Sequence, residues 1–311
     1  MDLTYPAFIW ALIQHMKLTT TMFLGAVCFA TTVSAQKIDL QAHRGGRGLM
    51  PENTIPAMIS AINLGVKTLE MDLAISKDGL LVVSHDSYMS SDFMRRPDGS
   101  DISKAEEKGL LIYGMDYSLV KSYDAGTKVH PQFATQKKMK TYRPLFSELI
   151  DSVETYIKKH KLKPVNYNVE IKSSPDGDGT AHPVPEVFVE KVMQVINQKK
   201  IGKRVVIQSF DKRPLQVLHA KYPNQELSFL IMNRDNFDAN IKNLGFTPQY
   251  LSPYFSLITP EMVKQAHEQK VKVLPWTVNN TEDFKKMEAL GVDGVITDFP
   301  NLGVAAYGKY Q

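Results

Sequence analysis

Short apolar, β-branched runs alternate along this chain with longer segments whose apolar residues recur at helical spacing. Nine runs are typical of strands, at residues 38–42, 68–75, 80–84, 165–171, 205–209, 226–231, 250–253, 272–278 and 294–298. Amphipathic segments that favour helices lie between most of them, at 54–64, 184–199, 213–221, 260–270 and 281–290. Strands that alternate with helices predict a parallel sheet covered by helices.

The second and third runs are separated only by Ser76-Lys77-Asp78-Gly79, a turn sequence too short for a helix. We therefore expect these two runs to form a β-hairpin. When the hairpin counts as one position, eight strand–helix units remain in about 270 residues, as in a TIM (β/α)8 barrel. A doubly wound parallel sheet stays open as the alternative. In a barrel, functional side chains gather at the carboxyl ends of the strands.

Residues 87–141 interrupt this alternation. The segment is polar and rich in Lys, Asp, Ser and Gly, with scattered aromatic residues. A structureless connection of this length is uncommon inside a compact domain. We expect an insertion that caps the catalytic face, placed between the strand hairpin and the following helix.

The composition is that of a globular protein. The chain has 311 residues, of which 43% are hydrophobic, so it can bury one large core or two small ones. Its formal charge is only +4, from 37 basic and 33 acidic residues, and no long run of like charge is present. We therefore expect no nucleic acid among its partners.

Residues 1–35 are expected to hold a secretory signal, whose typical features begin at Lys17. The single cysteine, Cys28, lies in a short apolar stretch that follows Lys17 and ends in small residues, which predicts cleavage after Ala35. The residues before Met16 do not fit the start of a signal peptide. We therefore expect translation to begin at Met16. The mature protein, with the barrel in residues 36–311, would be exported to the periplasm or secreted, without a cysteine or a stable membrane span. A retained N-terminal membrane anchor stays the alternative.

The strand at 68–75 carries acidic residues among apolar ones. Side chains alternate along a strand, so Glu70 and Asp72 share one face while Leu69, Met71 and Leu73 share the other. In a barrel the apolar face meets the helices, and the two carboxylates point into the lumen. Two uncompensated carboxylates would be costly to bury there.

The strand at 165–171 repeats this pattern, because Glu170 and Lys172 also face inward. A single acidic pair at this spacing usually marks only the solvated face of a strand. Two such strands in one barrel pattern instead indicate a site. Three inward carboxylates require a cation, and oxygen ligands suit one divalent ion, Ca²⁺ or Mg²⁺, rather than zinc.

Two histidines belong at the same rim, because His43 and His85 each end a strand-like run. The other histidines on predicted helices are taken as structural or exposed. Two imidazoles and a hard cation, together with Arg44 and Lys172, could bind an anion, polarise it and move protons.

The loop at 42–54, AHRGGRGLMPENT, follows the first strand. Its glycines allow the backbone to turn tightly around an anion, and Glu52 returns a carboxylate toward the site. Thr54 or Asn53 is the expected N-cap of the next helix, with Pro56 tolerated in its first turn.

These segments resemble a known family. AHRGGRGLMPENT, LEMDLAISKDGLLVVSHD, NVEIK, QSF, PWTVN and GVDGVITDFP occur in the order and register of the glycerophosphodiester phosphodiesterases, from Gln41 to Pro300 apart from much of the insertion. The resemblance implies a TIM-barrel hydrolase that uses a divalent ion to cut glycerophosphodiesters into sn-glycerol 3-phosphate and an alcohol. It further suggests attack by the glycerol 2-hydroxyl, followed by hydrolysis of the cyclic phosphate.

The resemblance also implies roles for individual residues. The implied metal ligands are Glu70, Asp72 and Glu170. The implied acid and base, in either order, are His43 and His85. The implied substrate-binding residues are Arg44 and Lys172 for phosphate, and Phe210 and Trp276 for glycerol. Glu52 is expected to hold Arg44 or to border the metal.

Other functions remain open at this point. A lysophospholipase D or sphingomyelinase D would keep the same residues and take a lipid, which predicts an exposed apolar rim. A phosphatidylinositol-type phospholipase C would stop at the cyclic phosphate. A non-catalytic binding protein would be expected to have lost a histidine or a carboxylate, and none is lost. We further hypothesise that aromatic residues of the insertion, including Tyr117 and Tyr123, restrict the site to small head groups such as choline, ethanolamine or glycerol. The alternative is that the insertion is a solvated surface with a few aromatic residues in its core.

Overall fold

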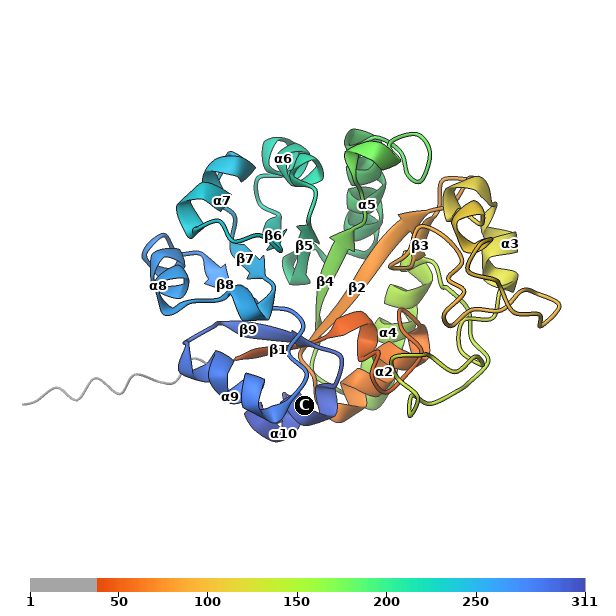
Figure 1. Cartoon of the computed structure of the whole chain (residues 1–311), viewed down its shortest axis with the longest axis horizontal. Helices are drawn as coiled ribbons and strands as arrows, with labels where there is room; N and C mark the ends of the chain where they lie inside the picture. Colours follow the sequence, from red (N-terminus) through yellow and green to blue (C-terminus); the bar gives the residue numbers. More distant parts are fainter. Residues whose placement is uncertain (1–37, 311) are drawn as a thin grey trace, which may run out of the picture. The chain divides into compact units, whose positions relative to one another are not determined.

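The computed structural model describes residues 38–310, so the expected signal segment, with Met16 and Cys28, lies outside the described residues. Eight strands of the described chain pair in parallel in the order β8-β7-β6-β5-β4-β2-β1-β9 (Figure 1). Their bounds are β1 Asp39–Ala42, β2 Thr68–Ile75, β4 Asn166–Ile171, β5 Val205–Ser209, β6 Glu226–Ile231, β7 Tyr250–Pro253, β8 Lys272–Val273 and β9 Gly294–Thr297. The expected hairpin is present, because β3 (Leu81–Val83) pairs antiparallel with β2.

Backbone hydrogen bonds close the ring between its two end strands. Val278 N donates to Ile296 O at 2.9 Å, and Ile296 N donates to Pro275 O at 2.9 Å. Strand β8 contains only Lys272–Val273, whereas the predicted strand ran over residues 272–278. Regular pairing ends early because Pro275 has no N–H to donate. The chain nevertheless continues between its neighbours, where Leu274 N donates to Leu251 O at 2.9 Å.

A helix follows each strand position and covers the outside of the ring (Figure 1). These helices are α2 Ile55–Leu64, α4 Phe146–His160, α5 Pro185–Lys199, α6 Lys212–Lys221, α7 Phe237–Leu244, α8 Pro260–Glu268, α9 Thr281–Ala289 and α10 Pro300–Tyr307. The apolar faces of the strands pack against them, so that Leu69, Met71 and Leu73 are fully buried. Thr54 caps α2 as expected, with its side chain accepting from Ala57 N. The fold is therefore the predicted TIM barrel.

Residues 87–141 contain the short helix α3 (Tyr117–Ser122) and two single 3-10 turns. They build a second apolar cluster against the face of the hairpin that carries Ala74 and Val82, opposite the face on which Leu73 and Val83 join the main core. Tyr117 and Tyr123 are buried inside this cluster, which differs from our expectation that they face the substrate. The segment thus folds around a small core of its own. Within residues 38–310, no helix combines the length and apolar character needed to span a bilayer.

Candidate active site

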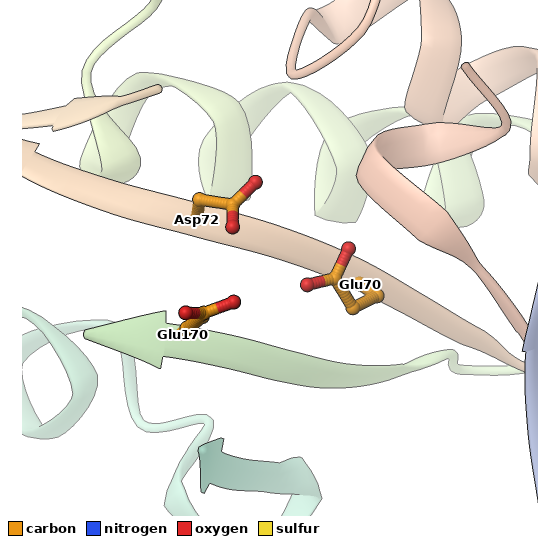
Figure 2. A group of neighbouring side chains, drawn as sticks. All are labelled: Glu70, Asp72 and Glu170. Atoms are coloured by element: carbon orange, nitrogen blue, oxygen red, sulfur yellow. The ribbon is translucent and has the colours of Figure 1, made fainter. Parts of the chain in front are cut away.

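Three carboxylates from neighbouring strands converge in the barrel lumen, and we call Glu70, Asp72 and Glu170 the carboxylate cluster (Figure 2). Asp72 on β2 lies directly opposite Glu170 on β4 in the strand register. One oxygen from each of the three side chains lies within 4.8 Å of the others, and all three residues are buried. The alternation of side chains along two paired strands therefore brings together the acidic residues that the sequence placed on one face.

The contacts of this cluster fit a hard cation. Glu70 accepts hydrogen bonds on both oxygens, from Arg44 N at 2.7 Å and from Gln208 Nε2 at 2.9 Å. Asp72 Oδ2 accepts from Asn53 Nδ2 at 2.8 Å, but Asp72 Oδ1 is buried without a hydrogen-bond partner. A buried carboxylate oxygen is normally satisfied. This partnerless oxygen in an all-oxygen set fits a divalent ion of the Ca²⁺ or Mg²⁺ type.

Like-charge crowding perturbs the same groups. Burial raises the pKa of Glu70 well above its usual range, and Asp72 raises it further. Burial likewise raises the pKa of Glu170 to about 7, although Lys172 opposes that rise. Lys172 Nζ donates to Glu170 Oε1 at 2.7 Å and lies 3.9 Å from Asp72 Oδ1. Lys172 and the Arg44 guanidinium, which contacts Asp72, are two cations beside three carboxylates, so the cluster keeps an excess of negative charge.

Arg44 reaches the carboxylate cluster from a tight turn after β1. Its backbone has φ 51°, and Gly45 and Gly46 that follow also have positive φ. A Cβ at Gly45 would lie 2.8 Å from the Cβ of Ala57 on α2, so only glycine allows the turn to pack so closely. The guanidinium Nε of Arg44 lies 3.4 Å from Asp72 Oδ2.

Glu52 lies among three arginines, and we call Arg44, Arg47 and Arg143 around it the arginine cluster. Arg44 Nη1 donates to both Glu52 oxygens at 3.1 and 3.2 Å. Arg47 Nε lies 3.3 Å and Arg143 Nη2 3.4 Å from the same carboxylate. Burial alone would raise the pKa of Glu52, but the three guanidinium groups lower it strongly. Glu52 was expected either to hold Arg44 or to border the metal. Its contacts fit the first of these roles.

Each candidate acid–base histidine contacts a carboxylate through Nδ1. The distance from His43 Nδ1 to Asp298 Oδ1 is 2.5 Å, and Asn279 donates to the other Asp298 oxygen at 2.8 Å. The distance from His85 Nδ1 to Asp86 Oδ1 is 3.0 Å. Burial lowers the pKa of both imidazoles, while the adjacent carboxylates oppose the fall. A carboxylate at Nδ1 leaves Nε2 of each ring for proton exchange.

A cavity of about 160 Å³ joins these groups. Of the residues expected in the site, it is lined by His43, Arg44, Glu70, His85, Glu170, Lys172, Phe210 and Trp276. The Phe210 and Trp276 rings meet edge to face, with centroids 5.3 Å apart. Asp72 and Glu52 lie behind this surface, and no residue of the 87–141 insertion lines the cavity.

The sequence interpretation assigned no site role to several residues that the structure brings here. Gln208 and Asp298 lie inside the motifs QSF and GVDGVITDFP. Gln208 could have been predicted as a site residue, because it is a polar residue on the inward face of a strand. Gln208 Oε1 accepts from Asn168 Nδ2 at 3.0 Å, so its amide donor is directed at Glu70. Arg47 and Arg143 belong to no strand or helix pattern in the sequence, so their spacing did not indicate that they lie at the site.

Comparison with known proteins agrees with this geometry. Residues 43–302 match the glycerophosphoryl diester phosphodiesterase family. A glycerophosphodiester phosphodiesterase from Caldanaerobacter subterraneus is 31% identical over 261 residues, which are 83% of this chain and 93% of the relative. A Silicibacter pomeroyi structure assigned to the same enzyme type has a TM-score of 0.78 at 28% identity, covering 88% of this chain and 93% of the other.

A second solved structure is an Oleispira antarctica phosphodiesterase in complex with its product sn-glycerol-3-phosphate. It has a TM-score of 0.68 at 23% identity and covers 87% of this chain and 96% of its own, which shows the shared fold. Together with the family match over residues 43–302, these relatives show that the chain belongs to the glycerophosphoryl diester phosphodiesterase family and is an enzyme of that type.

Proposed function

We propose that this enzyme hydrolyses glycerophosphodiesters to sn-glycerol 3-phosphate and an alcohol, with one divalent cation, Ca²⁺ or Mg²⁺, and two catalytic histidines. The observation that carries the proposal is one cavity lined by His43, His85 and Lys172 beside the carboxylate cluster. The Oleispira relative that binds sn-glycerol-3-phosphate supports the identity of the product.

Glu70, Asp72 and Glu170 would hold the cation, with the partnerless Asp72 Oδ1 among the donors. When bound, the cation supplies positive charge that stabilises the phosphoryl oxygens as the diester bond breaks. Arg44 and Lys172 add fixed positive charge at the same cavity. Fixed charges of this kind are commonly the largest contribution to catalysis, because they are already oriented before the reaction.

The two histidines move the protons. In the first step one imidazole Nε2 accepts the proton of the glycerol 2-hydroxyl as that oxygen attacks phosphorus, and the other donates a proton to the departing alcohol. In the second step water opens the cyclic phosphate, and the two imidazoles exchange roles. Asp298 and Asp86 would keep each ring oriented through Nδ1. Each proton transfer contributes roughly 10²- to 10⁴-fold in rate.

The test is a product analysis with and without metal. Protein dialysed against chelator receives glycerophosphocholine or a lysophosphatidylcholine, each with Ca²⁺, Mg²⁺ or EDTA, and choline and sn-glycerol 3-phosphate are quantified. We expect both products from glycerophosphocholine, only in the presence of a divalent cation.

Full activity in EDTA would contradict the metal requirement. Preference for the lysolipid would favour the lysophospholipase D alternative, and a cyclic phosphate as the end product would favour the phospholipase C reaction.

A further inference from the structure

Residues 130–137 of the insertion contact the loop that carries Arg47. Gln136 Nε2 donates to the carbonyl oxygen of Arg47 at 2.7 Å, and Arg47 Nη2 donates to Gln132 Oε1 at 2.9 Å. The Arg47 guanidinium carbon lies 4.9 Å from the centroid of the Phe133 ring. Both the backbone and the side chain of Arg47 are therefore held by the insertion.

Arg47 is also a lining residue of the active-site cavity. The described contacts of residues 87–141 reach no other lining side chain. Arg47 Nε lies 4.0 Å from Asp298 Oδ1, the same oxygen that contacts His43. Arg47 thus stands on the His43 side of the cavity, where an oxygen of the substrate must exchange a proton.

Arg44 and Arg143 occupy Glu52, so the Arg47 guanidinium can interact with a ligand. Arg44 and Arg143 both donate hydrogen bonds to Glu52, and Arg143 does not line the cavity. Three guanidinium groups share Glu52, and the other carboxylate near Arg47, Asp298, is also in contact with His43. Within residues 38–310, Nε of Arg47 is buried without a hydrogen-bond partner, although it lies 3.3 Å from Glu52 Oε2. The arginine cluster therefore presents two guanidinium groups, those of Arg44 and Arg47, to the cavity.

We propose that Arg47 binds an oxygen of the substrate beside His43, and that the insertion acts on substrate affinity through Arg47 rather than by touching the substrate. The proposal rests on the proposed function and adds to it a substrate-binding residue and a role for the insertion. The oxygen is either a phosphoryl oxygen or a glycerol hydroxyl, both of which accept a hydrogen bond from a guanidinium. Holding a long side chain in place before binding lowers the entropy lost when the ligand arrives.

The first test replaces Arg47 itself and measures KM and kcat separately. We expect Arg47→Met to raise KM for glycerophosphocholine by about 10- to 100-fold, the range for loss of a hydrogen bond to a charged group. The kcat and the metal affinity measured by calorimetry should stay within about threefold, since a larger change would imply a share in the chemical step or the metal site. An unchanged KM in Arg47→Met would overturn the proposal, whereas absence of hydrolysis by the wild-type protein would instead overturn the proposed function.

The second test frees Arg47 while keeping its charge. Phe133→Leu and Gln132→Leu should each raise KM by about 2- to 10-fold, because the arginine must then be immobilised on binding. Tyr88→Leu is the matched control, since the Tyr88 ring faces Lys108 Nζ at 3.6 Å within the same insertion and does not contact Arg47. We expect its KM to equal that of the wild type.

A third test combines Phe133→Leu with Arg47→Met in one protein. If the insertion acts through Arg47, Phe133→Leu adds nothing to the KM of Arg47→Met, because residues in one contact are not additive. Independent, multiplied effects would contradict the inferred route. Gln132→Leu lies at an exposed contact and tests the same point should Phe133→Leu fail to fold.

Product inhibition distinguishes the two sources of the oxygen. If Arg47 binds the phosphoryl group, Arg47→Met raises the inhibition constants of both sn-glycerol 3-phosphate and inorganic phosphate. If it binds a glycerol hydroxyl, the inhibition constant of sn-glycerol 3-phosphate rises and that of inorganic phosphate is unchanged. If the inhibition constants and the KM of Arg47→Met equal those of the wild type, both sources are excluded.

Discussion

The carboxylate cluster and the arginine cluster are both buried groups of charges, but they are imbalanced in opposite directions. The first places three carboxylates beside Lys172 and the Arg44 guanidinium, and leaves Asp72 Oδ1 without a hydrogen-bond partner. The second places three guanidinium groups around one carboxylate, Glu52. Arg44 joins them, since its backbone N donates to Glu70 and its side chain donates to Glu52. A site with adjacent excesses of both signs is suited to a cation and an anion bound side by side.

The largest expected effect comes from the carboxylate cluster. Glu70→Gln, Asp72→Asn and Glu170→Gln should each lower kcat/KM by more than about 10³-fold, because several kcal/mol of transition-state stabilisation depend on the cation. Steady-state assays at saturating Ca²⁺ or Mg²⁺ measure the loss. Near-wild-type activity in any of the three would show that this carboxylate does not serve the cation.

The histidines come next. His43→Ala and His85→Ala should each reduce kcat by about 10²- to 10⁴-fold, since each removes one proton transfer. Metal binding should remain, because neither imidazole belongs to the carboxylate cluster. Calorimetric titration of each variant provides that control, and a variant with wild-type kcat would identify its histidine as structural.

Glu52→Gln tests the arginine cluster. Loss of the carboxylate leaves three guanidinium groups without their shared partner, and breaking a buried ion pair from one side costs about 3–5 kcal/mol in the free energy of unfolding. Urea denaturation followed by circular dichroism measures this change. Stability equal to the wild type would mean that solvent, rather than Glu52, compensates these arginines.

A smaller effect is expected at the hydrogen-bond partner of Glu70. Gln208→Met removes the donor to Glu70 Oε1 while keeping the side-chain length. Loss of such an outer partner typically weakens metal binding by about 10- to 100-fold. Calorimetry should show weaker binding at unchanged stoichiometry, and an unchanged dissociation constant would show that Arg44 N alone orients Glu70.

The smallest expected change is a shift in one titration. Burial lowers the pKa of His43 and Asp298 partly restores it, because the carboxylate stabilises the imidazolium. Asp298→Asn removes that stabilisation, so the pKa of His43 should fall further. NMR titration of the His43 ring measures the shift. A pKa that rises or stays constant would contradict the inferred electrostatic role of Asp298.

The carboxylate cluster could be predicted from the sequence because it depends on local periodicity. Side chains alternate along a strand, so the spacing of Glu70 and Asp72 fixed their common face, and the parallel register of β2 and β4 brought Glu170 opposite. Strand bounds were predicted well for the same reason, as at residues 68–75 and 205–209. The 272–278 run was overextended because Pro275 interrupts regular pairing.

The arginine cluster could not be predicted in this way. Arg143 donates to a residue 91 positions earlier in the chain, and no periodic pattern records such a contact. Tyr117 and Tyr123 were hypothesised to lie near the substrate because the insertion was the only segment large enough to cover the rim, yet they pack into the small core beside the hairpin. Irregular segments are ordered by specific long-range contacts, which a single sequence does not encode in its spacing.

The central claim is that the carboxylate cluster binds one divalent cation. The most direct measurement is calorimetric titration of Ca²⁺ and Mg²⁺ into chelator-stripped wild-type protein and Asp72→Asn, in the absence of substrate. We predict one ion per chain for the wild type, and for Asp72→Asn an affinity at least about tenfold weaker, because a charged oxygen ligand is lost. Equal affinities in the two proteins, or no binding by a wild-type protein that hydrolyses glycerophosphocholine in EDTA, would contradict the account.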